Sequence, residues 1–71
     1  MKKNNQSYVI FADLLLNDVK YLCRRADGRF YTCIVAEENG GFCEHDVQDV
    51  SAADAREFVA AAFNRAMNTI R

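Results

Sequence analysis

Apolar and polar residues alternate through the first two thirds of the chain. Residues 19–25 place Val, Tyr and Cys against Lys, Leu and Arg, and a period of two is typical of a β-strand. Residues 8–16, 30–37 and 42–47 are similarly rich in β-branched, aromatic and other apolar side chains. The pattern therefore predicts four strands.

Short turn motifs separate these runs. Asn17-Asp18 is a two-residue hairpin signal, and Ala26-Asp27-Gly28 offers a glycine where φ is positive. Asn39-Gly40-Gly41 is the strongest turn motif in the chain. Such short connections predict an antiparallel meander.

The last third of the chain follows a helical period. Ser51 is a good N-cap, and Asp54 places a carboxylate near the positive end of the helix. Apolar positions then recur with helical spacing and form one face, which we expect to be core rather than a cofactor-binding surface. The residues of this face are Ala55, Phe58, Val59, Ala62, Phe63, Ala66, Met67 and Ile70.

Together these elements predict an α+β fold, an antiparallel four-stranded β-meander packed on one C-terminal amphipathic α-helix. Residues 1–7 are polar and charged, so we expect a flexible N-terminal tail followed by a single domain over residues 8–71. An alternative stays open, in which residues 7–17 form a helix and the order becomes α-β-β-β-α.

The three turns imply a register, and the register assigns side chains to two faces of the sheet. The helix is expected to cover the nearly apolar face. Its residues are Ile10, Ala12, Leu14, Leu16, Val19, Tyr21, Cys23, Tyr31, Cys33, Val35, Cys43, His45 and Val47. Shifting the last turn by one residue would put Glu44 and Asp46 beside Cys33 and Val35, so this register is rejected.

No second helix remains to cover the opposite face. A contiguous exposed apolar patch on so small a domain usually marks an interface, with apolar anchors and a charged rim. We therefore predict a protein-binding surface on this face. Its residues are Leu22, Arg24, Phe30, Ile34, Phe42, Glu44 and Asp46.

Composition limits the class of protein. The chain has 71 residues, of which 51% are apolar, and this indicates one folded domain, for which a homodimer is an open source of extra stability. A net charge of −1 argues against a nucleic-acid binder, which is usually basic. The sequence shows no signal peptide and no apolar run long enough for a membrane. We expect a cytoplasmic protein with reduced cysteines.

Candidate chemistry is sparse. Cys23, Cys33, Cys43 and His45 are zinc ligands by type, but their spacing of ten, ten and two contains no Cys-x-x-Cys pair. Cys43 and His45 could form a nucleophile–base pair, but no third group to orient it is identifiable. We predict no metal, no cofactor and no enzymatic activity.

Two family resemblances carry functional implications. The helix start Ser51-Ala52-Ala53-Asp54-Ala55-Arg56, after three strands, resembles the C-terminal half of a double-stranded-RNA-binding domain. That resemblance implies RNA binding and a first helix over residues 7–17. Members of that family bind phosphate with lysines at the helix start, where this chain has Ala52 and Ala53.

The chain from Tyr8 also resembles small phage-encoded anti-CRISPR proteins. The hairpin turns Ala26-Asp27-Gly28 and Asn39-Gly40-Gly41, followed by the Ser51 cap, carry this resemblance. It implies an inhibitor that occupies a surface of a bacterial CRISPR-Cas effector complex in the host cytoplasm. A HicB-type antitoxin has a similar outline but carries a further DNA-binding segment, so a small homodimeric regulator stays open as an alternative. The other alternative is a nucleic-acid-binding module that uses Arg24, Arg25 and Arg29.

Overall fold

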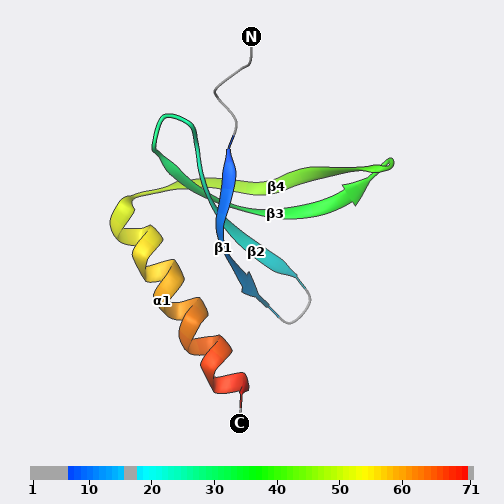
Figure 1. Ribbon diagram of the computed structural model, residues 1–71. Coiled ribbons are helices and arrows are strands. Elements are labelled where there is room, and N and C mark those ends of the chain that lie inside the picture. Colours follow the sequence, from blue (N-terminus) through cyan, green and yellow to red (C-terminus); the bar gives the residue numbers. More distant parts are fainter. Residues whose placement is uncertain (1–6, 16–17, 71) are drawn as a thin grey trace.

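The computed structural model describes residues 7–15 and 18–70. Its elements are β1 (Tyr8–Leu14), β2 (Val19–Arg24), β3 (Phe30–Glu38), β4 (Gly41–Val50) and α1 (Ala52–Thr69). The strands form one antiparallel sheet in the order β1-β2-β3-β4, with α1 packed against it (Figure 1). The predicted α+β fold is confirmed. The alternative first helix over residues 7–17 is wrong, since most of that segment is β1.

The first hairpin has a longer loop than predicted. Leu14 pairs with Val19, and the backbone N–H of Leu15 donates to the carbonyl of Asp18 at 2.8 Å. β1 therefore stops two residues before the predicted end of the strand, Leu16. Leu16 itself and the Asn17 of the predicted turn lie outside the described residues.

The second hairpin agrees with the prediction. Cys23 pairs with Tyr31, and Gly28 has a φ of 94°, a conformation that glycine adopts without a steric cost. The N–H of Gly28 donates to the carbonyl of Arg25 at 2.9 Å and closes the turn.

The third hairpin differs from the prediction in its loop length and its register. Its loop is the two-residue pair Asn39-Gly40, with φ of 53° and 82°, which is the geometry that Asn-Gly favours. Val35 consequently pairs with Glu44, in the register that the sequence analysis rejected. A bulge in β4, where Asp46 has a φ of 55°, restores the expected register nearer the sheet centre.

The helix starts as predicted. The backbone N–H of Asp54 donates to the Ser51 hydroxyl at 3.1 Å, which satisfies one of the free donors at the helix end. The apolar face, however, is only partly core. Ala55 and Ala62 are buried, whereas Phe63, Met67 and Ile70 are exposed, so the prediction of a core face is wrong for its C-terminal half.

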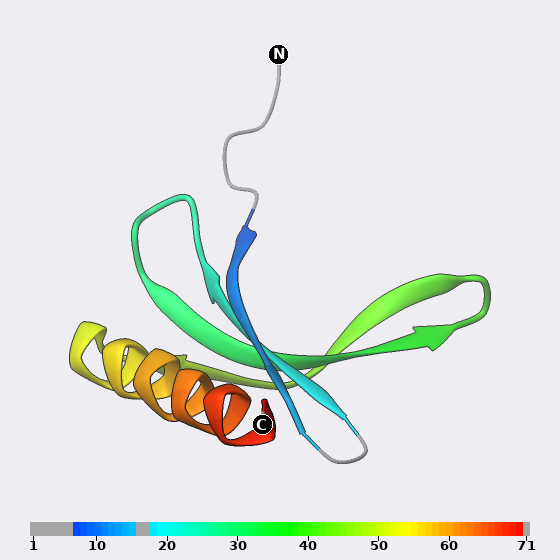
Figure 2. The same cartoon turned by 60° about the horizontal axis from the view of Figure 1, so that its bottom comes forward.

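The helix lies on the face of the sheet that was expected to be open. Arg65 of α1 donates two hydrogen bonds to Asp13 of β1, at 3.0 and 2.6 Å, and Leu22 of β2 is 1% exposed beside α1. β3 curves away from the helix toward both of its ends, so the opposite face of the sheet is hollow there (Figure 2). A straight helix fits the outer side of this curve, where its buried alanines allow the helix backbone to approach the sheet closely.

The hollow face has a buried centre of its own. Cys23, Tyr31 and Cys33 are almost fully buried there, with Tyr21 and Val35 packed against them. These residues were expected to lie under the helix; the curl of the sheet buries them instead. Among the residues that the structure describes, no helix is long and apolar enough to cross a membrane.

Candidate protein-binding arm

The outer half of the β3–β4 hairpin projects from the molecule, on the side away from α1 (Figure 1). We call residues 36–46 the arm. Its local pattern explains why it forms: extended residues on both sides of an Asn-Gly pair make a tight two-residue hairpin.

The arm is exposed on both faces. Every residue from 37 to 46 is exposed, and β4 has no exposed-to-buried alternation until its last residue. Phe42 is 78% exposed and pairs across the hairpin with Glu37. So exposed an aromatic side chain gains little burial within its own chain and is available for a contact outside it.

The arm is also acidic. It carries Glu37, Glu38, Glu44 and Asp46, and no Lys or Arg occurs between Arg29 and Arg56. Four carboxylates give the arm a formal charge of −4, so with a total of −1 the rest of the chain carries +3. The imidazole of the arm's histidine lies 2.9 Å from one of these carboxylates, that of Glu38.

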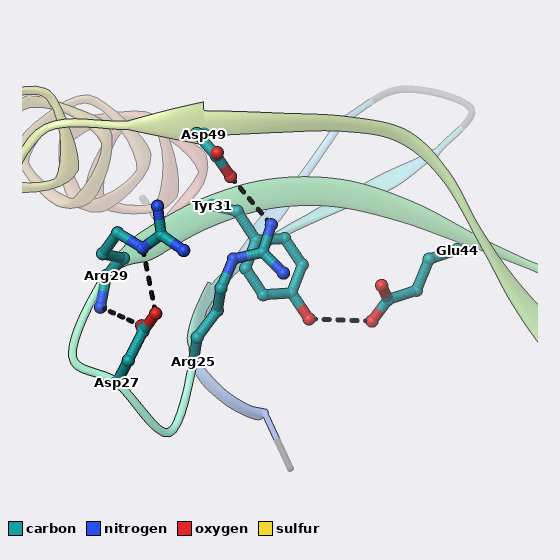
Figure 3. A network of polar contacts seen from close by, with 6 residues as sticks. All are labelled: Arg25, Asp27, Arg29, Tyr31, Glu44 and Asp49. Atoms are coloured by element: carbon teal, nitrogen blue, oxygen red, sulfur yellow. Dashed lines mark hydrogen bonds and ion pairs between the residues drawn. The ribbon is translucent and has the colours of Figure 1, made fainter. Parts of the chain in front are cut away.

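A polar network joins the arm to the hollow face (Figure 3). The Tyr31 hydroxyl donates to Glu44 at 3.0 Å, and Arg25 lies over the Tyr31 ring at 4.3 Å while donating to Asp49 at 2.7 Å. Burial, reinforced by the bond to Glu44 and opposed by one to Ser7, raises the pKa of Tyr31 to about 12. Tyr31 is therefore a neutral donor at physiological pH.

The arginines of the second turn are already engaged. Arg29 donates its backbone N–H and its Nε to Asp27, both at 3.0 Å, and the backbone bond is the main reason that the pKa of Asp27 is lowered. The hydrogen bond to Asp49 raises the pKa of Arg25. Arg24 lies over the Phe30 ring at 5.2 Å. This turn offers little unpaired positive charge for phosphate.

The cysteines divide into two buried and one exposed. Burial, followed by the electrostatic influence of the neighbouring Cys23, raises the pKa of Cys33 to about 12, so the Cys33 thiol stays protonated and is a poor nucleophile. Cys43 is exposed on the arm, two residues from His45. No group of three potential metal-ligating side chains occurs within residues 7–15 and 18–70.

The predicted protein-binding residues are separated by the fold. Leu22 is buried beside α1, which is a correction to its expected role as an exposed anchor, and Phe30 and Ile34 are half-buried. Arg24 is exposed at the second turn, engaged with Phe30. The remaining three residues are brought together on the arm. They are Phe42, Glu44 and Asp46.

Glu37 and Glu38 were not among the predicted protein-binding residues, although their position beside the third turn had indicated an acidic surface that could orient a partner. The signal that identifies them is the 26-residue stretch from 30 to 55 that has no Lys or Arg, in a chain with nine such residues. Comparison of the chain with protein-family models, curated proteins and solved structures gave no match. Its function therefore has to be inferred from the geometry of this surface.

Proposed function

We propose that the protein is a non-enzymatic inhibitor that docks its arm on a positively charged surface of a larger protein complex. The observation that carries this proposal is Phe42, 78% exposed on a projecting hairpin that holds four carboxylates. An aromatic anchor inside a charged rim is the usual composition of a protein-binding hot spot.

The charge of the arm favours one kind of partner. Acidic residues attract a basic surface during diffusion and disfavour a neutral or acidic one. Basic protein surfaces of this kind commonly serve to bind nucleic acid. An arm of charge −4 on such a surface would compete with the phosphate backbone for the same side chains.

Among nucleic-acid-binding complexes we favour a bacterial CRISPR-Cas effector, as the resemblance to anti-CRISPR proteins implies. In this proposal the chain is encoded by a phage or mobile element and acts in the host cytoplasm. The paired arginines of the second turn give less support to direct binding of RNA or DNA by this chain, because their charge is already compensated.

The test uses purified effector complexes loaded with guide RNA, and measures their binding to target DNA with and without the protein. At least one complex should lose DNA binding, and Phe42→Ala should weaken this inhibition about tenfold or more. Tyr8→Ala is the matched control, because it truncates another exposed aromatic residue, one that pairs with Arg24 at the end of the strands away from the arm.

A second variant tests the charge. Glu37→Lys should weaken inhibition, whereas Glu57→Lys, the same reversal on the exposed surface of α1, should leave it unchanged. A panel in which no complex is inhibited, or in which the arm variants inhibit as strongly as the original chain, would contradict the proposal.

A further inference from the structure

A second apolar surface lies on the other side of the molecule from the arm, where α1 runs alongside β1 (Figures 1 and 2). We call it the seam. Its groove-lining residues are Ile10, Leu14, Val59, Phe63 and Ile70, and the exposed Met67 adjoins them, one helical turn after Phe63. Two open grooves line the seam, one containing Ile10, Val59 and Phe63, the other containing Leu14 and Ile70.

The apolar side chains of the seam are largely exposed, although the buried core of the domain is small. Leu14 and Ile70 are 74% and 72% exposed, and Phe63, Met67 and Ile10 are 55%, 52% and 42% exposed. The buried apolar residues that the structure describes are six, and two of them are alanines and two are cysteines. A domain of this size often gains its missing burial by association.

From these observations we propose that the seam is the interface of a symmetric homodimer. At roughly 180 Å² for a fully exposed large apolar residue, the exposed fractions amount to roughly 500 Å² per copy. When all of this surface is covered, two copies bury about 1,000 Å² of apolar surface, which reaches the lower limit for a specific interface before any polar rim is counted.

The spacing of the helix residues suits a second copy of the same chain. Val59, Phe63, Ala66 and Ile70 follow one another at intervals of four, three and four, which is the spacing of a coiled-coil contact. In an antiparallel pair about a two-fold axis, Val59 of one copy faces Ile70 of the other. Phe63 likewise faces Ala66, so the surface is self-complementary.

The charges also permit self-association at the seam. Among the residues that line the two grooves, Asp13 and Arg65 neutralise each other, and Arg56 is the other charged residue. Two seams therefore meet without strong repulsion. Two arms would repel each other, because each carries four carboxylates.

The test is sedimentation of the full chain over roughly three decades of concentration. The mass should rise from 8.1 kDa to twice that value. Phe63→Glu should weaken the dimer about 100-fold, because the charge enters the interface twice. Asn64→Glu is the matched control, since it adds the same charge one position along, about 100° around the helix, where the side chain lines neither groove of the seam, and it should leave the dimer intact.

Circular dichroism checks that each variant is folded. If the Phe63→Glu variant is unfolded, Met67→Glu is tested in its place. Amide exchange of the unaltered chain adds a measurement that needs no variant: residues 59–69 should exchange more slowly as concentration rises. A chain that stays at 8.1 kDa, a dimer insensitive to both seam variants, or concentration-independent exchange would overturn the proposal. None of these measurements depends on whether the arm inhibits an effector complex.

Discussion

Tyr31 links the centre of the sheet to the base of the arm. Its ring is buried on the hollow face, its hydroxyl donates to Glu44, and the guanidinium of Arg25 lies over the ring. An aromatic residue that packs and donates at once is costly to leave unpaired, because a buried hydroxyl without a partner loses its hydration. The same side chain therefore stabilises the fold and orients the arm.

The raised pKa of Tyr31 predicts a dependence of stability on high pH. In the unfolded chain the phenol ionises near pH 10, and in the folded chain only near pH 12. The unfolded state then holds fewer protons, so the stabilisation is complete below pH 10 and is lost as the pH rises toward 12. Urea unfolding across this window measures the effect.

Tyr31→Phe is the control for that measurement. Below pH 10 it should be less stable than the original chain by about 1 kcal/mol, the typical net value of one hydrogen bond. The difference should shrink as the pH rises toward 12, because the variant has no phenol to ionise there. A difference that stays constant across the window would contradict the assignment.

The thiols give a second prediction at this scale. An alkylating reagent in mildly alkaline buffer should modify one cysteine of the folded chain, Cys43, because the other two are buried and Cys33 stays protonated. Cys43→Ser should leave no fast-reacting thiol, and the unfolded chain should expose all three. Rapid modification of Cys33 in the folded chain would show that the hollow face opens.

At the scale of elements, local turn chemistry decided which parts of the fold could be predicted. Ala26-Asp27-Gly28 has one glycine in the position that needs positive φ, and its register was predicted correctly. Asn39-Gly40-Gly41 has two glycines, so its loop could have two or three residues. The apolar pattern then favoured the wrong choice, because the bulge at Asp46 changes the register within β4.

Gly40 supplies the test of this turn. Its φ of 82° makes Gly40→Ala unfavourable by about 1 kcal/mol, although no atom lies within 4 Å of the added Cβ. Because the arm is exposed, the effect should be local: its amides should exchange roughly fivefold faster, with little change in the urea midpoint. Gly41→Ala meets only ordinary contact with the Glu38 carbonyl and should change neither quantity.

At the scale of the whole molecule, the sequence predicted the number of layers but not their arrangement. The helical period of residues 55–70 identifies an apolar face without saying how much of it meets the sheet. The alternation in the strands likewise cannot tell a face covered by a helix from one buried by curvature. Leu22 was therefore expected to be open, and Cys23 and Tyr31 to be covered by the helix.

The two proposed surfaces differ in physical character, so salt concentration should affect arm docking and dimerisation differently. Arm docking depends on charge, and exposed charges are largely screened beyond about 10 Å at 0.1 M salt. Raising sodium chloride from about 0.05 to about 0.5 M should therefore weaken inhibition of an effector complex at least tenfold.

The seam depends on apolar burial, so the same change in sodium chloride should alter the dimer dissociation constant by less than about threefold. Sulfate, which strengthens burial, should tighten the dimer. Sedimentation and DNA-binding inhibition, measured in one salt series, thus report on the seam and the arm independently. A dimer that dissociates in sodium chloride as readily as the inhibitor is released would mean that charged residues, not Phe63 and its neighbours, hold the two copies together.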